Sequence, residues 1–133
     1  MVFKKHTSLI MMTTDEKELL LKDLCARLPY GVKMDHIADD EYSSNTLIGI
    51  AKDMITLEGL GGYECVNVEH YKPYLFPLSS MTEEQRNEYH ELLYNPKHGI
   101  DIDYFDWCHK NHLDCRGLIP KYLAINATGL NIY

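Results

Sequence analysis

Residues 46–68, TLIGIAKDMITLEGLGGYECVNV, decide the fold that the sequence predicts. Two apolar-rich runs, 46–51 and 54–58, flank Lys52-Asp53, and residues 63–68 alternate between apolar and polar after a glycine-rich turn. This is the pattern of short strands joined by tight turns, and residues 31–37 add a fourth such strand. Because no helical crossover fits between these strands, we predict an antiparallel meander or a small SH3-like curled barrel over residues 30–76.

Helical patterns lie on both sides of this region. Residues 14–27 begin after Thr13, which has capping-box spacing to Glu16, and they carry leucines at four-residue steps. Further helices are expected over residues 82–94 and 103–111. We therefore predict an α+β fold with an N-terminal helix, the small sheet or barrel, and C-terminal helices packed on it.

The start of the second of these helices is marked twice. Ser80 with Glu83 and Thr82 with Gln85 both have capping-box spacing. Before them, residues 71–77 contain two prolines and are expected to be extended.

The length of 133 residues fits a single domain, which we place at residues 13–133. Residues 1–12 are expected to form a disordered tail, with Met12 as an alternative start to Met1. No apolar run approaches the roughly 18 residues that a membrane span needs, so we expect a cytoplasmic protein. Its four cysteines, Cys25, Cys65, Cys108 and Cys115, are then expected to be reduced thiols.

The charge balance argues against general nucleic-acid binding. Thirteen basic residues face twenty acidic ones, which gives a net charge of −7, and neither half of the chain is basic. Neutralising phosphates is the main sequence-independent source of affinity for DNA and RNA. A uniformly acidic chain is a poor candidate for that role.

Three segments carry a resemblance. LPYGV at residues 28–32, KPYLFPLSSMTEE at 72–84 and KNHLDCRGLI at 110–119 resemble an uncharacterised family of small proteins from gut Bacteroidetes and their phages and mobile elements, with the pattern LPYGV … KPYLRPMSSMTEEE … NSHHFDYRGLI. The resemblance covers residues 28–130, with departures at Phe76 and Cys115, where the family has Arg and Tyr. It implies a short accessory protein of phage or mobile-element origin and implies no activity, ligand or site residues.

Aromatic side chains form the first candidate surface for a partner. Tyr71, Tyr74 and Phe76 lie beside two prolines, and tyrosine is enriched at interfaces, so we predict an exposed aromatic groove. The alternative is that these rings close the sheet against the helices.

Acidic side chains form the second candidate surface. Many acidic residues are accounted for by helix caps and by the outward faces of helices. Two groups are not: the loop residues Asp39, Asp40 and Glu41, and the cluster Asp101, Asp103 and Asp106. Carboxylates in the second group are of the type that holds Mg²⁺ or Ca²⁺, but aspartates at a helix start are already favoured by capping and by the helix dipole.

The segment around residues 108–115 is the densest group of cysteines and histidines. Cys108 and His112 would lie one turn apart on a helix, and Cys115 could supply a third zinc ligand, with a fourth from His90, His98 or Cys65. The same segment also allows a nucleophilic dyad of Cys108 or Cys115 with a histidine. Buried cysteines often act only as small apolar side chains, so we expect neither a metal nor a cofactor.

Three functional hypotheses follow. The first is a non-enzymatic accessory protein that binds a host or phage protein, one form of which is an inhibitor of a host defence system whose basic channel the acidic chain would occupy. The second is a nucleic-acid-binding module on the small barrel, whose basic face would have to be built from Lys33, Lys52, Lys72, Arg86, Arg116 and Lys121. The third is a small Cys/His enzyme. Sequence patterns leave the oligomeric state open.

Overall fold

The computed structural model describes residues 12–39, 41–59 and 61–133. Its first helix, α1, spans Thr14–Arg27 as predicted. The Thr13 hydroxyl accepts a hydrogen bond from the Glu16 amide at 3.1 Å, and the Glu16 carboxylate accepts one from the Thr13 amide at 2.9 Å. This reciprocal pair is the expected capping box. Of the expected tail, residues 1–11 lie outside the described residues, whereas Met12 packs against the core.

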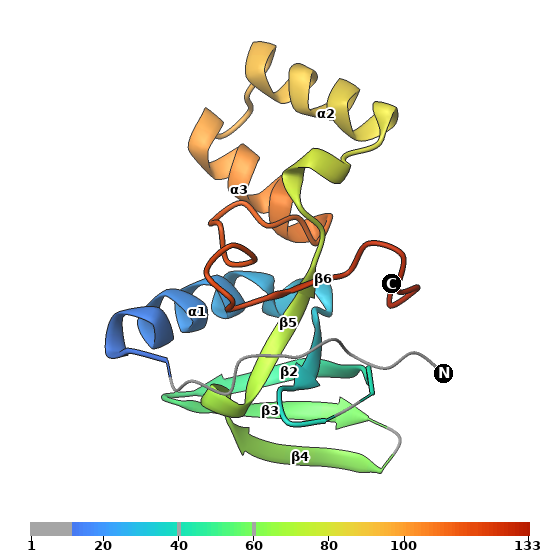
Figure 1. Cartoon of the computed structure of the whole chain (residues 1–133). Coiled ribbons are helices and arrows are strands. Elements are labelled where there is room, and N and C mark those ends of the chain that lie inside the picture. The colour runs from blue at the N-terminus through green and yellow to red at the C-terminus, as the bar shows by residue number, and fades with distance from the viewer. Residues whose placement is uncertain (1–11, 40, 60) are drawn as a thin grey trace.

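A six-stranded mixed sheet follows (Figure 1). Its order is β4-β3-β2-β1-β5-β6, and only the β5–β6 pair is parallel. The strands are β1 (Lys33–His36), β2 (Asn45–Ala51), β3 (Met54–Gly59), β4 (Gly62–Asn67), β5 (Tyr71–Leu75) and β6 (Ile125–Asn126). The α+β class and the β2–β3–β4 meander are confirmed. Strands β1 to β5 form the predicted antiparallel part in the order β4-β3-β2-β1-β5, and β6 adds a parallel strand at the β5 edge that the sequence did not predict.

The β2–β3 hairpin turns at Lys52-Asp53, as the sequence predicts. Lys52 has a φ of 55°, in the left-handed region where glycine or asparagine is more usual. The hairpin therefore forms without a glycine at this position.

The main core lies between α1 and one face of the sheet. Leu20 and Leu24 of α1 are fully buried and belong to one apolar cluster with side chains of β1, β2, β3 and β5. Leu118 and Leu123, from the segment between α3 and β6, join the same cluster. Short 3-10 helices span Leu28–Tyr30, Val68–His70 and Leu78–Ser80.

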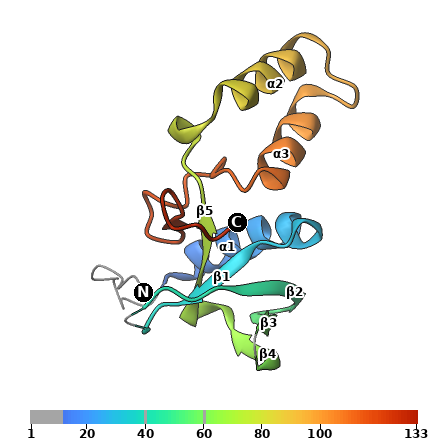
Figure 2. The same ribbon diagram turned by 90° about the vertical axis from the view of Figure 1, so that its right-hand side faces the viewer.

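The two C-terminal helices form a hairpin that stands apart from the sheet (Figures 1 and 2). Helix α2 spans Glu83–Tyr94 and α3 spans Ile100–Lys110; we call residues 83–110 the arm. Some of their apolar side chains, among them Tyr89, Leu92 and Tyr104, pack in a second cluster centred on Trp107 and Leu113, and α2 has no fully buried residue. The expectation that these helices pack on the sheet is therefore wrong, because α1 and the C-terminal segment lie between them and the strands.

The ends of the arm helices differ in part from the prediction. Thr82 caps α2 with Gln85 as expected, but Ser80 lies in a 3-10 turn and its hydroxyl donates to the Pro77 carbonyl at 2.7 Å. Helix α3 starts three residues before the predicted position. None of the helices that the structure describes combines the length and apolar character needed to cross a membrane.

Candidate functional site

The predicted aromatic groove does not form around β5. Tyr71 and Tyr74 are buried, and Tyr74 has no exposed surface; its hydroxyl donates to the Ser43 carbonyl at 2.6 Å. Phe76 is half-buried, and its ring centroid lies 5.8 Å from that of Tyr133. The exposed aromatic groove is therefore wrong for both tyrosines. The reason is that Tyr71 belongs to the main core cluster, whereas Tyr74 contacts Tyr42 and Ser43 in the segment before β2.

The acidic side chains of the loop after β1 make few contacts among the described residues. Asp39 is exposed and lies 3.8 Å from the Nδ1 atom of His36, while Glu41 is half-buried. Asp40 lies outside the described residues. Nothing in this loop organises a ligand site among the residues that the structure describes.

The second acidic group lies on the arm. The Asp103 carboxylate accepts hydrogen bonds from the backbone amides of Lys97 at 2.6 Å and His98 at 3.1 Å, and these bonds lower its pKa. Asp106 accepts a hydrogen bond from the Tyr30 hydroxyl, and Asp101 is exposed. Asp103 therefore fixes the loop between the two arm helices, Asp106 ties the arm to Tyr30, and the described residues do not bring the three carboxylates together as a metal site.

The tip of the arm carries an apolar surface. Four large apolar side chains between residues 93 and 102 are exposed: Leu93 (41%), Tyr94 (81%), Ile100 (43%) and Ile102 (65%). Between the two helices lies a groove of about 200 Å³, lined by Tyr89, Leu92, Leu93, Ile100, Asp101 and Tyr104. The whole arm has seven acidic and three basic side chains, a net charge of −4. The arm thus presents apolar groups within an acidic surface.

The zinc set predicted from the sequence is not assembled. Helix α3 ends at Lys110, and His112 has a φ of 57°, so Cys108 and His112 do not share a helix face. The His112 ring instead stacks on Tyr133 with centroids 3.7 Å apart, and burial lowers its pKa to about 4. As for the proposed fourth ligands, His90 and Cys65 are exposed, and His98 bonds Asp103.

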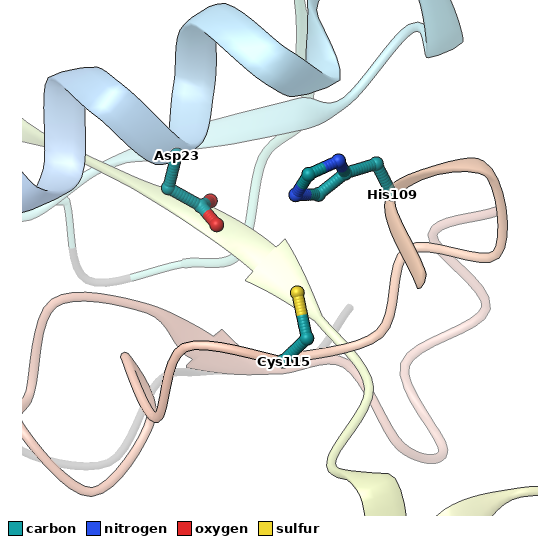
Figure 3. A group of neighbouring side chains, drawn as sticks. All are labelled: Asp23, His109 and Cys115. Atoms are coloured by element: carbon teal, nitrogen blue, oxygen red, sulfur yellow. The ribbon is translucent and has the colours of Figure 1, made fainter. Parts of the chain in front are cut away.

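A different group of chemically active side chains is buried where α1, the end of α3 and the following loop meet (Figure 3). We call Asp23, His109 and Cys115 the buried cluster. One ligand atom from each residue lies within 4.8 Å of the others. Asp23 and His109 are buried at 0% and 4% exposure, and Cys115 is half-buried. The cluster combines a carboxylate, an imidazole and a thiol.

The loop after α3 places Cys115 in the cluster. The Phe76 amide donates to the His112 carbonyl, and the Asp114 amide donates to the Phe76 carbonyl, both at 2.8 Å. The buried Asp114 carboxylate then accepts hydrogen bonds from the amides of Leu118 and Ile119 at 2.7 and 2.9 Å. Both sides of Cys115 are therefore fixed by backbone hydrogen bonds.

Two guanidinium groups surround the Asp23 carboxylate. Arg27, fully buried, donates from Nε at 2.6 Å and from Nη2 at 3.2 Å, and its Nη2 also donates to the Leu113 carbonyl at 2.7 Å. The Nε atom of Arg116 lies 3.4 Å from the same carboxylate. The Asp23 carboxylate is therefore paired and multiply hydrogen-bonded, which is the condition under which a buried carboxylate is tolerated.

The thiols of Cys108 and Cys115 interact within this region. A hydrogen bond from Cys115 lowers the pKa of the Cys108 thiol, and the same contact together with burial raises the pKa of Cys115. The raised pKa of Cys115 disfavours its thiolate in the metal-free protein, and the Asp23 carboxylate hydrogen-bonds Arg27 rather than a histidine, so the geometry does not form the nucleophile, base and orienting carboxylate of a catalytic triad.

The sequence patterns did not select Asp23 or Arg27 as site residues, and His109 stood out only as part of the cysteine and histidine segment around residues 108–115. Asp23 precedes Leu24 of the apolar stripe in the first helix, yet it is buried. The i, i+4 spacing of Asp23 and Arg27 is visible in the sequence, but such pairs usually lie on helix surfaces. Their burial depends on the C-terminal loop that covers this face of α1.

The basic face of the nucleic-acid hypothesis loses two of its six members. Lys72 is only 6% exposed on β5, directly opposite Asp35 of β1, and Arg116 lies against Asp23. Lys33 donates to the Thr46 hydroxyl at 2.7 Å. These basic side chains contact groups within the molecule, whereas the nucleic-acid hypothesis requires them to be free on the surface.

Comparison with known protein families, with curated proteins and with solved structures found no match for this chain.

Proposed function

We propose that the protein is a non-enzymatic cytoplasmic accessory protein that binds a positively charged host or phage protein through its arm. The observation that carries the proposal is the apolar tip of the arm, Leu93, Tyr94, Ile100 and Ile102, within an acidic surface. Leu93 and Ile100 line one groove, and exposed apolar groups rimmed by polar residues are typical of interaction sites. The origin in a phage or mobile element rests on the sequence resemblance.

The charge of the arm indicates the kind of partner surface that it would bind. An arm with a net charge of −4 attracts a basic surface and repels an acidic one. The groove between α2 and α3 is large enough to receive an apolar side chain of that partner and has Asp101 at its edge. We therefore propose a partner surface that combines lysine or arginine side chains with one projecting apolar group; a defence protein with a basic nucleic-acid channel has this chemistry.

The shape of the arm favours the same role. Helix α2 has no fully buried residue, and the hairpin stands clear of the sheet (Figure 2). The Trp107 Nε1 atom donates to the Glu88 carboxylate at 2.8 Å and ties α3 to α2. The arm is thus an ordered projection whose outer surface is left for contact.

The test compares two variants of the purified protein. Ile100→Ser with Ile102→Ser removes apolar groups from the arm, and Ile48→Ser with Tyr63→Ser removes exposed apolar groups from the sheet as a matched control. Proteins captured from a host lysate by the wild type are identified, purified and titrated directly. We expect the arm variant to bind at least about tenfold more weakly, a change of about 1.4 kcal/mol, while the control keeps its affinity.

Salt provides the second readout. Affinity for the purified partner should fall as salt rises, and Glu84→Gln with Asp101→Asn should reduce that dependence. Equal affinities for the arm variant and the control would contradict the proposal, and so would a partner with an acidic contact surface.

A further inference from the structure

We propose that the buried cluster is a binding site for a thiophilic divalent metal ion, with Asp23, His109 and Cys115 as ligands and Cys108 as the fourth donor. Zinc is the ion whose ligand preferences fit this set best. The site differs from the one that the sequence suggested, since His109 and Asp23 replace His112 and the distant fourth ligands.

The donor set has the chemistry and the proximity that zinc requires. Structural zinc is held by cysteine sulfur, histidine nitrogen and carboxylate oxygen in a tetrahedral arrangement, with neighbouring donors about 3.5 Å apart. The three donor atoms already lie within 4.8 Å of one another. A contraction of about 1 Å, within reach of side-chain rotation, would bring them to coordination distance.

His109 supplies an independent observation that points to a ligand. Its Nε2 atom is buried and has no hydrogen-bond partner, in a residue with only 4% of its surface exposed. Figure 3 shows a ring nitrogen of His109 facing the Asp23 carboxylate and the Cys115 sulfur. A buried polar atom without a partner is unfavourable, and a bound metal ion would supply the missing partner.

Cys108 is the proposed fourth donor, and its sulfur has to move toward the ion, because it is not among the donor atoms that already lie within 4.8 Å of one another. Its thiol accepts a hydrogen bond from Cys115, so the two sulfur atoms are neighbours. Cys108 belongs to the last turn of α3, next to His109, and is fully buried. Two cysteines, one histidine and one aspartate make a four-coordinate site.

The positive charges of the two arginines have to be balanced when a cation binds. Cysteine ligands bind zinc as thiolates, so each thiol that gives up a proton on binding offsets one positive charge of the ion. Arg27 and Arg116 then remain on Asp23 as outer hydrogen-bond donors, as is usual for carboxylates that bind metals.

A metal here would have a structural consequence. Asp23 comes from α1, Cys108 and His109 come from the end of the arm, and Cys115 comes from the loop that leads back to the sheet. The ion would connect the two apolar clusters of the molecule. It would fix the base of the arm and leave its tip unchanged, so this site is independent of the partner-binding surface.

Cobalt provides the direct probe. The full chain, without a histidine tag and with reduced thiols, is titrated with Co²⁺ and then with Zn²⁺. We expect one equivalent of Co²⁺ to bind, with thiolate-to-cobalt charge-transfer absorption and the visible bands of a tetrahedral site, and Zn²⁺ to displace it. Absence of stoichiometric binding by the wild type would overturn the proposal.

Variants and alkylation locate the site. Cys115→Ser and His109→Gln should weaken Co²⁺ binding at least about tenfold, whereas Cys25→Ser and Cys65→Ser, at exposed thiols, should not. Should the first two variants fail to fold, alkylation of the wild type replaces them. Zn²⁺ should slow labelling of Cys108 and Cys115 and leave Cys25 and Cys65 unchanged. Protection of the exposed pair, or of neither pair, refutes the assignment.

Discussion

Arg27 should be the most costly side chain to remove from α1. In Arg27→Met the fully buried Asp23 carboxylate loses two hydrogen bonds, and the Leu113 carbonyl loses its donor. Removing one partner of a buried ion pair costs about 3–5 kcal/mol, because the other charge stays buried without compensation. Arg116 lies 3.4 Å from Asp23 and still offsets part of its charge in the variant. We therefore expect the free energy of unfolding to fall by about 3 kcal/mol, the low end of that range.

Urea unfolding followed by circular dichroism, with EDTA present to exclude metals, measures this loss. The midpoint should fall by about 1–3 M urea. Lys22→Met, at an exposed position of the same helix, is the control and should change the free energy of unfolding by less than about 0.5 kcal/mol. Arg27→Lys keeps the charge but loses the paired hydrogen bonds, and it should lie between the wild type and Arg27→Met.

The double variant Asp23→Leu with Arg27→Met separates the ion pair from simple packing. Because it removes both charges from the interior, it should recover most of the stability lost in Arg27→Met. A loss below about 1 kcal/mol in Arg27→Met, or a double variant no more stable than that single one, would refute the reasoning.

Three further predictions concern other parts of the chain. Burial lowers the pKa of His112 to about 4, so the unfolded chain, with a histidine pKa near 6.5, binds the proton first as pH falls. The free energy of unfolding should therefore fall by about 2–3 kcal/mol between pH 6.5 and pH 4. Asparagine tolerates left-handed backbone, so His112→Asn should fold and should lack this pH-dependent fall in urea titrations at several pH values. Thr82→Ala removes the acceptor for the Gln85 amide at the start of α2 and should lower the free energy of unfolding by about 1 kcal/mol in thermal melts; no change would argue against the cap. Tyr89→Ala removes a ring packed on Trp107, the single tryptophan, and should cost about 1–3 kcal/mol and move the tryptophan emission to longer wavelength. An unshifted emission spectrum would show that Tyr89 does not shield that indole.

Local patterns predicted the elements well where their cause is local. The Thr13 and Thr82 caps and the turn at Lys52 depend on residues within three or four positions, and each formed as expected. The predicted Ser80 cap did not form, because the Ser80 hydroxyl donates to the Pro77 carbonyl within a 3-10 turn. Helix α3 begins at Ile100, earlier than predicted, because the Asp103 carboxylate accepts hydrogen bonds from the amides of Lys97 and His98, which precede the helix.

The candidate sites were harder to predict, because they depend on which segments meet. Tyr74 looks like an exposed aromatic residue beside prolines, but its side chain is buried and contacts Tyr42 and Ser43, some thirty positions earlier in the chain. His112 has metal-ligand spacing to Cys108 and Cys115, but the left-handed backbone after α3 turns its ring to Tyr133. His109, inside the helix, takes the place next to Cys115.

The sequence by itself determined the α+β class, the first helix, the meander and the acidic character of the arm, because hydrophobic period, turn residues and charge act over short distances. Only the tertiary structure decided that the C-terminal helices stand away from the sheet. Only the tertiary structure brought Asp23, His109 and Cys115 together. Their meeting depends on the loop after α3 returning across α1, and that path is fixed by backbone hydrogen bonds between Phe76 and residues 112–114.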